Sequence, residues 1–219
     1  MNDRAVILER LKSANATRER TPHPGAAVPP KAGSLTGKAR LERFIDQATA
    51  QYASIAEIGS LEDLPGHLSA WLRGQNLPAE CVIAPMLGGL AWSEGAVSVR
   101  EGAALTSDMV GVSLAYAAAA ETGTVMMIAD GATPTSINFV PDVEVIVVSK
   151  ADIEAGIEGC WEKLRGWKGQ GKPMPRAVNF ITGPSRTADV EATMVLGAHG
   201  PRRLHLVLMD ERSPWPGNR

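Results

Sequence analysis

The segment 176–210 constrains the fold of this chain more than any other, because it reads as one continuous supersecondary unit. Residues 177–181 form a short apolar run rich in strand formers, and the Gly-Pro-Ser sequence at 183–185 interrupts it. Residues 187–196 have a helical composition with apolar residues on one face, and residues 204–209 form a second apolar strand. Two buried strands joined by a helix predict parallel pairing and a right-handed crossover.

The rest of the chain alternates between helical and strand patterns, which is typical of an α/β fold. Apolar residues recur either at helical spacing or in short runs rich in strand formers. The expected helices cover 35–51, 61–73 and 151–166, and the expected strands cover 54–58, 81–84, 109–115, 125–129 and 143–148. We therefore predict one α/β domain in which a largely parallel sheet is flanked by helices.

Composition divides the chain into three parts. Residues 1–34 combine an amphipathic stretch, expected to be a helix, with a Pro-rich linker through which a helix cannot continue. Residues 35–212 form the α/β domain, and residues 213–219 form a tail with two prolines. The N-terminal part fits two interpretations: an arm that grips a partner or a second copy, or a loosely attached appendage.

Composition and charge exclude several functions. Of the 219 residues, 44% are apolar and 21% are charged, which is typical of a soluble globular protein. The formal net charge of −2 argues against nucleic acid or an anionic membrane as a partner. No apolar run approaches the roughly 18 residues of a membrane span, and residues 1–20 are too charged for a signal peptide. We therefore expect a cytoplasmic protein.

The cysteine count argues against a metal centre in this chain. Cys81 and Cys160 are the only two and lie far apart in the sequence, whereas an ordinary iron–sulfur cluster takes about four closely spaced thiolates. His23, His67 and His205 share no metal-ligand spacing. The chain has neither a G-x-G-x-x-G fingerprint nor a P-loop. We therefore predict no metal site, and we interpret both cysteines as ordinary buried residues.

The turn after the first strand of segment 176–210 carries the first group of candidate ligand-binding residues. Ser185, Thr187 and Asp189 can each accept hydrogen bonds from unpaired amides at the start of the predicted helix. Those amides and the helix dipole also attract an anion, and Arg186 adds a fork of donors suited to carboxylate or phosphate. Gly183 allows the backbone to turn sharply. Plain capping of the helix, with Arg186 in solvent, fits the same residues.

A second turn carries the candidate acid–base residue. Four alanines precede Glu121, and burial among them would raise the pKa of its carboxyl and suit it to acid–base catalysis. Thr122, Gly123 and Thr124 offer two hydroxyls and a close backbone approach to an oxyanion. A structural cap at Glu121 and an ordinary turn at 122–124 are the alternatives. We predict that both turns face one cleft at the carboxyl ends of neighbouring strands.

Three stretches resemble the LUD-domain family, and within it the lactate-utilization protein C group. The longest covers 183–208, the second is the Ala-Glu-Thr-Gly-Thr element at 120–124, and the third, at 136–142, departs in detail from the family pattern. Together the resemblance spans about residues 40 to 210. It implies an α/β fold similar to the ribose-5-phosphate isomerase and CoA-transferase group.

The same resemblance implies a function and partners. The family implies a subunit of a system that oxidises L-lactate to pyruvate beside Cys-rich iron–sulfur subunits. The clusters are then expected in those partner proteins, with no cofactor in this chain. The fold-level similarity to CoA-transferases transfers no catalytic role to Glu121.

Two further functions fit the residues. One is a stand-alone enzyme or binding module for a small anionic metabolite, either phosphorylated or CoA-linked. The other is a non-catalytic protein that steadies the Cys-rich partners. The sequence leaves open whether this chain is itself catalytic, whether its ligand is a carboxylate or a phosphate, and how many copies assemble.

Overall fold

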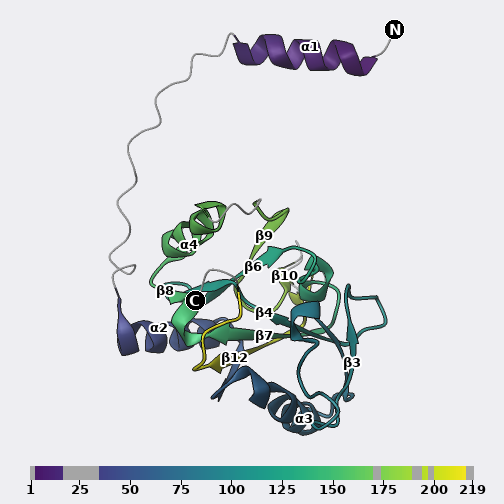
Figure 1. Ribbon diagram of the computed structural model, residues 1–219, viewed down its shortest axis with the longest axis vertical. Coiled ribbons are helices and arrows are strands. Elements are labelled where there is room, and N and C mark those ends of the chain that lie inside the picture. Colours follow the sequence, from purple (N-terminus) through teal and green to yellow (C-terminus); the bar gives the residue numbers. More distant parts are fainter. Residues whose placement is uncertain (1–2, 17–34, 170–173, 189–193, 197–199, 216–219) are drawn as a thin grey trace.

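A six-stranded parallel sheet forms the centre of the computed structural model, which describes residues 3–16, 35–169, 174–188, 194–196 and 200–215 (Figure 1). In spatial order its strands are β1 (Ser54–Ile58), β12 (Arg203–Met209), β7 (Val143–Ser149), β4 (Val110–Leu114), β2 (Glu80–Ile83) and β3 (Ser98–Glu101). Every neighbouring pair is parallel. The predicted α/β fold with a largely parallel sheet is confirmed.

A smaller second sheet lies beside the first. Its order is β8 (Ile153–Glu154), β5 (Ala117–Ala119), β6 (Thr124–Ala129) and β9 (Ala177–Ile181). Strands β5 and β6 form an antiparallel hairpin, β9 pairs antiparallel with β6, and β8 pairs parallel with β5. The all-alanine strand β5 is fully buried, because small side chains let the two sheets approach closely.

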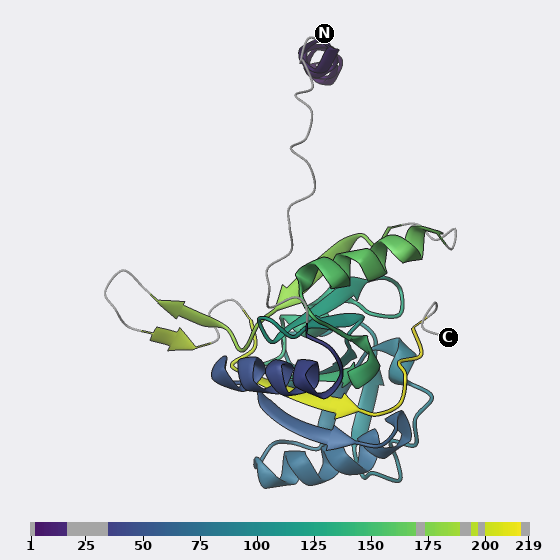
Figure 2. The ribbon, with the colours of Figure 1, turned by 90° about the vertical axis from the view of Figure 1, so that its left-hand side faces the viewer.

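Helices cover both faces of the parallel sheet. Helix α2 (Gly37–Ala50) packs on one face and α3 (Leu64–Gly74), preceded by the 3-10 turn η2 (Leu61–Asp63), packs on the other (Figure 2). Helix α4 (Ile157–Gly169) contacts β5 and β8 of the second sheet. The remaining 3-10 turns are η3 (Pro85–Leu87), η4 (Thr135–Asn138) and η5 (Lys150–Asp152).

Strand β7 shows why the parallel sheet needs a helical layer on each face. Successive side chains of a strand point to opposite faces. Val145 and Val147 therefore join the apolar cluster under α3, whereas Ile146 and Val148 join the cluster under α2. A strand buried on both faces reads as a continuous apolar run, which is how it was predicted from the sequence.

The expected N-terminal helix is present as α1 (Asp3–Ala16), and it lies apart from the α/β domain in both views (Figures 1 and 2). Val6, Ile7 and Leu8 on this helix are exposed. Among the described ranges, no helix combines the length and apolar character that crossing a membrane requires.

The predicted helix at 187–196 is wrong. Its two described ends are the strands β10 (Arg186–Ala188) and β11 (Met194–Leu196), which pair antiparallel. Figure 2 shows this yellow-green hairpin projecting from the domain. The predicted parallel pairing of 177–181 with 204–209 is also wrong, because β9 joins β6 in the second sheet while β12 lies in the first. Without a crossover helix, the chain has no βαβ unit at this place.

The segment expected to form a C-terminal tail contributes to the core. Trp215 is 2% exposed, and its Nε1 donates a hydrogen bond to the carbonyl oxygen of Ala115 at 2.8 Å. Its ring also meets Tyr116 edge-on, with centroids 5.7 Å apart. This indole therefore anchors the end of the described chain beside β4 and β5.

Cys81 and Cys160 are both buried free thiols, which confirms their interpretation as ordinary buried residues. Burial raises the pKa of each thiol to about 12. Neither thiol forms a thiolate near neutral pH, so neither is a reactive nucleophile.

Two histidines that are distant in the sequence meet between α3 and β12. The Nε2 atoms of His67 and His205 lie 3.2 Å apart, and Trp71 stacks on the His205 ring with centroids 4.2 Å apart. The hydroxyl of Ser54 lies 2.8 Å from Nδ1 of His205. Burial, followed by the charge of His67, lowers the pKa of His205 to about 4.

We predict that His205 makes the protein acid-sensitive. Its folded-state pKa lies below its ordinary value of 6.5, so its contribution to stability is present above about pH 6.5 and is lost as pH falls toward 4. The loss amounts to at most about 3 kcal/mol. Urea unfolding of His205→Asn across this range should show a smaller change in stability with pH than the parent chain. Equal pH dependence in both proteins would contradict the assignment.

Candidate functional site

The turn at 121–124 is the loop of the β5–β6 hairpin. Its Gly123 has φ +68°, a left-handed backbone conformation that is energetically unfavourable for residues other than glycine. A Cβ added to Gly123 would lie 2.3 Å from the backbone nitrogen of Ala48 in α2. The glycine is therefore required both by the turn and by the helix backbone against it.

Glu121 holds the start of α4. Its Oε1 accepts a hydrogen bond from the Ile157 amide at 3.0 Å, and its own amide donates to the carbonyl oxygen of Ala155 at 3.1 Å. A carboxylate at this position satisfies a free amide and complements the positive end of the helix dipole. The structural cap that the sequence left open is thus the role visible in the geometry.

The turn at 182–186 approaches the same end of α2. Gly183 has φ +86°, and a Cβ added there would lie 2.3 Å from the carbonyl oxygen of Gln51. The guanidinium of Arg186 lies over the ring of Tyr52, 3.3 Å from the centroid. Both glycine turns therefore pack on the C-terminal end of α2.

A chain of hydroxyl groups joins the two turns. The Thr122 hydroxyl lies 2.7 Å from that of Thr124, which in turn lies 2.6 Å from the hydroxyl of Thr182. Thr124 begins β6 and Thr182 directly follows β9, and these strands run antiparallel. The structure thus places the 121–124 turn beside the 182–186 turn.

The 182–186 turn also borders a cavity of about 200 Å³. The turn contributes Thr182, Gly183 and Ser185, and the amide of Ser185 donates to the Pro201 carbonyl oxygen at 2.7 Å. The other lining residues come from η4 and its end, from β7, from β9 and from the start of the β12 segment: Asn138, Phe139, Glu144, Phe180, Ile181, Gly200 and Pro201. Two of the stretches that carry the family resemblance, 183–208 and 136–142, thus contribute lining residues, and the 120–124 stretch is joined to the lining through the Thr124–Thr182 hydroxyl contact.

Glu144 is the unusual member of this lining. It is 1% exposed, and neither oxygen of its carboxyl has a hydrogen-bond partner among the described residues. Its register neighbours on the flanking strands, Gly111 and Leu204, bring no side-chain donor. Burial therefore holds the pKa of the Glu144 carboxyl well above its ordinary value.

Two expectations about the site's position need correction. The two turns follow the carboxyl ends of β5 and β9 in the second sheet, but only the 182–186 turn lines the cavity. In the parallel sheet the cavity lies at the amino ends of β7 and β12, because Glu144 is the second residue of β7 and Pro201 precedes β12. Arg186 and Thr187 lie in strand β10, so the helix-start amides expected beside them are absent there. Asp189 lies outside the described residues.

Sequence reasoning missed Glu144, Thr182 and Tyr52. The available signal for Glu144 was a single acidic residue inside the apolar strand 143–148. Thr182 was passed over because it adjoins the turn without belonging to its Gly-Pro-Ser core. Nothing local to Tyr52 indicated that its ring would lie under Arg186.

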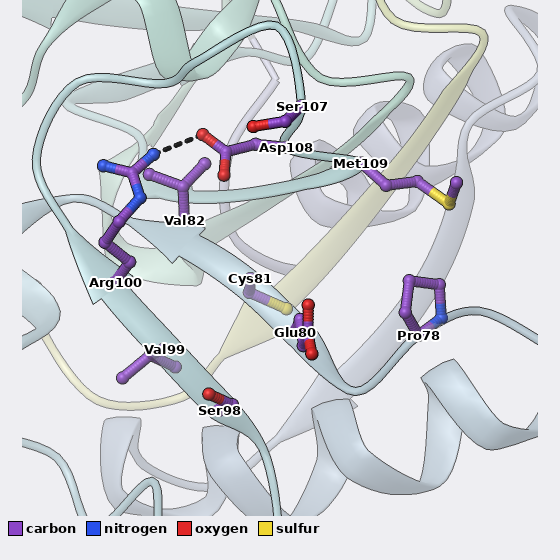
Figure 3. A pocket seen from close by; sticks show the side chains of 10 residues that line it. All are labelled: Pro78, Glu80, Cys81, Val82, Ser98, Val99, Arg100, Ser107, Asp108 and Met109. Atoms are coloured by element: carbon purple, nitrogen blue, oxygen red, sulfur yellow. Dashed lines mark hydrogen bonds and ion pairs between the residues drawn. The ribbon is translucent and has the colours of Figure 1, made fainter.

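A second cavity, of about 260 Å³, lies at the opposite edge of the sheet between β2, β3 and the loop before β4 (Figure 3). Arg100 and Asp108 face each other there in an ion pair. Asp108 also accepts from the Leu105 amide at 2.6 Å, and Arg100 donates to the Ala103 carbonyl oxygen at 3.1 Å. Because Arg100 and Asp108 already pair with each other, this cavity is the weaker candidate.

Comparisons with known proteins agree with the resemblance. The LUD domain matches residues 41–209. The chain is 29% identical over 103 residues to lactate utilization protein C 1 of Bacillus mycoides, covering 47% of this chain and 44% of that protein. It is 30% identical over 103 residues to lactate utilization protein C of Bacillus subtilis, covering 47% and 43%. The match thus spans less than half the length of these relatives.

A solved structure has the same fold. The crystal structure of a DUF162 family protein from Deinococcus radiodurans superimposes with a TM-score of 0.60 at 21% identity. The superposition covers 80% of this chain and 99% of that one. It supports the α/β architecture and, at this identity, nothing more specific.

We predict that Gly123→Ala destabilises the protein by at least about 2 kcal/mol, since it forces a side chain into a left-handed conformation and against the α2 backbone. Gly131→Ala is the matched control, because a Cβ at Gly131 meets nothing within 4 Å; we expect a change within about 0.5 kcal/mol. Chemical denaturation measures both. Equal stability of the two variants would show that α2 does not hold this turn.

Proposed function

The chain belongs to the LUD-domain family, and we propose that it is a component of a lactate-utilization system that oxidises L-lactate to pyruvate. The names of the Bacillus relatives support the lactate role. A ligand site within this chain is supported because two of the resembling stretches line one small cavity and the third contacts Thr182 of that lining.

We place the electron carriers of the proposed reaction in partner proteins. Oxidation of lactate to pyruvate removes two electrons and two protons, so the system requires an electron acceptor. Cys81 and Cys160 do not fit an iron–sulfur cluster, because one is in β2, the other is in α4 and both are buried. Iron–sulfur subunits rich in cysteine are therefore the proposed partners.

The proposed ligand is a small carboxylate bound at the 182–186 turn. Ser185 lines the cavity and brings a hydroxyl, and Gly183 allows backbone to lie close to the ligand. Thr122 and Thr124 support the site through the hydroxyl chain to Thr182. In this proposal Glu121 serves the site by fixing the start of α4 and the hairpin loop.

The alternative is a stand-alone enzyme or binding module for a phosphorylated or CoA-linked metabolite. This alternative depended on a predicted helix that begins at residue 187 and offers its N-terminus to an anion. Residues 186–188 form strand β10 instead. The carboxylate proposal therefore has the stronger support, and direct comparison of L-lactate with phosphate tests the choice.

Deleting the gene for this chain should abolish growth on L-lactate while leaving growth on pyruvate unchanged, because pyruvate enters after the oxidation. A tagged chain should also co-purify iron-containing proteins, whereas the chain purified alone should contain no stoichiometric iron. Growth curves and metal analysis measure these outcomes. Undiminished growth of the deletion strain on L-lactate would contradict the proposed function.

Arg186→Ala should weaken L-lactate binding by up to about 1 kcal/mol, because an exposed positive charge directly after Ser185 is lost, although Arg186 does not itself line the cavity. Melting temperature should change little, since the side chain is exposed and its contact with Tyr52 is a surface one. Arg73→Ala, at an exposed residue in α3, is the control. Calorimetry that finds equal affinity in both variants would remove Arg186 from the site.

A further inference from the structure

Glu144 is buried in β7 without a hydrogen-bond partner among the described residues, and this burial is energetically unfavourable. A buried carboxyl without a hydrogen-bond partner is unfavourable even in its neutral form. Every other residue of β7 except the terminal Ser149 is apolar, so an apolar residue at 144 would suit the strand better. The stability of the fold therefore does not explain why a carboxyl occupies this position, and a functional reason is needed.

The surroundings of Glu144 supply one. It is one of the residues that line the cavity, as are the polar residues Asn138, Thr182 and Ser185, and both of its carboxyl oxygens are buried. Two glycines, Gly183 and Gly200, line it too and leave room for a ligand. The rest of the lining is apolar, which is the usual composition of a small-molecule site: an apolar wall with a few polar groups that fix orientation.

We infer that the Glu144 carboxyl is the buried polar anchor of a ligand site in this cavity, and that it binds a small 2-hydroxycarboxylate through paired hydrogen bonds. This inference rests on the proposed function and adds to it the residue that receives the ligand.

The chemistry of a buried carboxyl selects the ligand class. A neutral carboxyl has one O–H donor and a carbonyl acceptor. A 2-hydroxycarboxylate offers a carboxylate oxygen to accept from that O–H and a hydroxyl to donate to that carbonyl. A phosphate monoester dianion has no donor. Inorganic phosphate near neutral pH has an O–H but carries up to two negative charges, so its burial beside Glu144 is less favourable than burial of a singly charged carboxylate.

The raised pKa is consistent with this arrangement. Burial holds the pKa of Glu144 well above its ordinary value of 4.5, so the donor form persists above that pH. Once pH exceeds the folded-state pKa, the carboxyl becomes an anion that repels a carboxylate ligand. Binding should therefore weaken as pH rises through that value.

Three variants of the full chain test the inference by titration calorimetry with L-lactate. Glu144→Leu removes both hydrogen-bonding groups and should weaken binding at least about tenfold. Glu144→Gln keeps a donor and an acceptor but cannot ionise, so it should retain affinity within about threefold and lose the pH dependence. Ser113→Ala is the control, because Ser113 is a second buried polar residue without a partner in the described part of the chain, and it does not line the cavity.

Thermal melting without ligand provides an independent readout. Glu144→Leu should raise the melting temperature by about 2–4 °C, because it removes the orphaned carboxyl. A variant that is more stable yet no longer binds L-lactate cannot owe its loss of binding to misfolding. Inorganic phosphate, titrated in parallel, should bind more weakly than L-lactate.

Several results would overturn the inference. They are unchanged L-lactate affinity in Glu144→Leu, equal losses in Ser113→Ala and Glu144→Leu, tighter binding of phosphate than of L-lactate, or no L-lactate binding by the parent chain. The proposed function fails separately. If the purified chain binds L-lactate through Glu144 while the deletion strain still grows on L-lactate, the inferred ligand site is supported and the proposed function is contradicted.

Discussion

The close approach of the α2 backbone to two glycines is the contact on which the site depends. A Cβ on Gly123 would lie 2.3 Å from the nitrogen of Ala48, and one on Gly183 would lie 2.3 Å from the oxygen of Gln51. These glycines belong to loops of different strands in the second sheet. One helix end therefore sets both loops side by side, and the hydroxyl chain to Thr182 and the cavity beyond it follow from that placement.

The parallel sheet contributes mainly to the core, whereas the second sheet contributes mainly to the proposed binding site. The parallel sheet is buried on both faces, so its strands are selected for apolar side chains and contribute most of the core. The second sheet supplies the turns, with their polar residues, at its rim. Glu144 is the point where these roles meet, because it lies in a core strand and also lines the cavity. Natural proteins often keep such locally unfavourable residues where a ligand needs them.

Much of the fold was predictable from local pattern, and most of the site was not. Strands such as 143–148 and 204–209 were found because continuous apolar runs are the local signature of doubly buried strands. The segment 187–196 was misread, because its composition allows a helix while antiparallel pairing of Arg186 with Leu196 decides the outcome. Glu144 was passed over, because one polar residue hardly changes a strand's pattern. Its importance comes from the lack of a partner among the residues that the structure describes, which only the three-dimensional arrangement reveals.

A crystal structure of the chain grown with L-lactate would show directly whether Glu144 receives the ligand. We expect density for one L-lactate in the cavity between β7 and the 182–186 turn, within hydrogen-bonding distance of the Glu144 carboxyl and the Ser185 hydroxyl. L-lactate bound elsewhere, for example beside Arg100 and Asp108 in the second cavity, with the Glu144 carboxyl left without a partner, would contradict it.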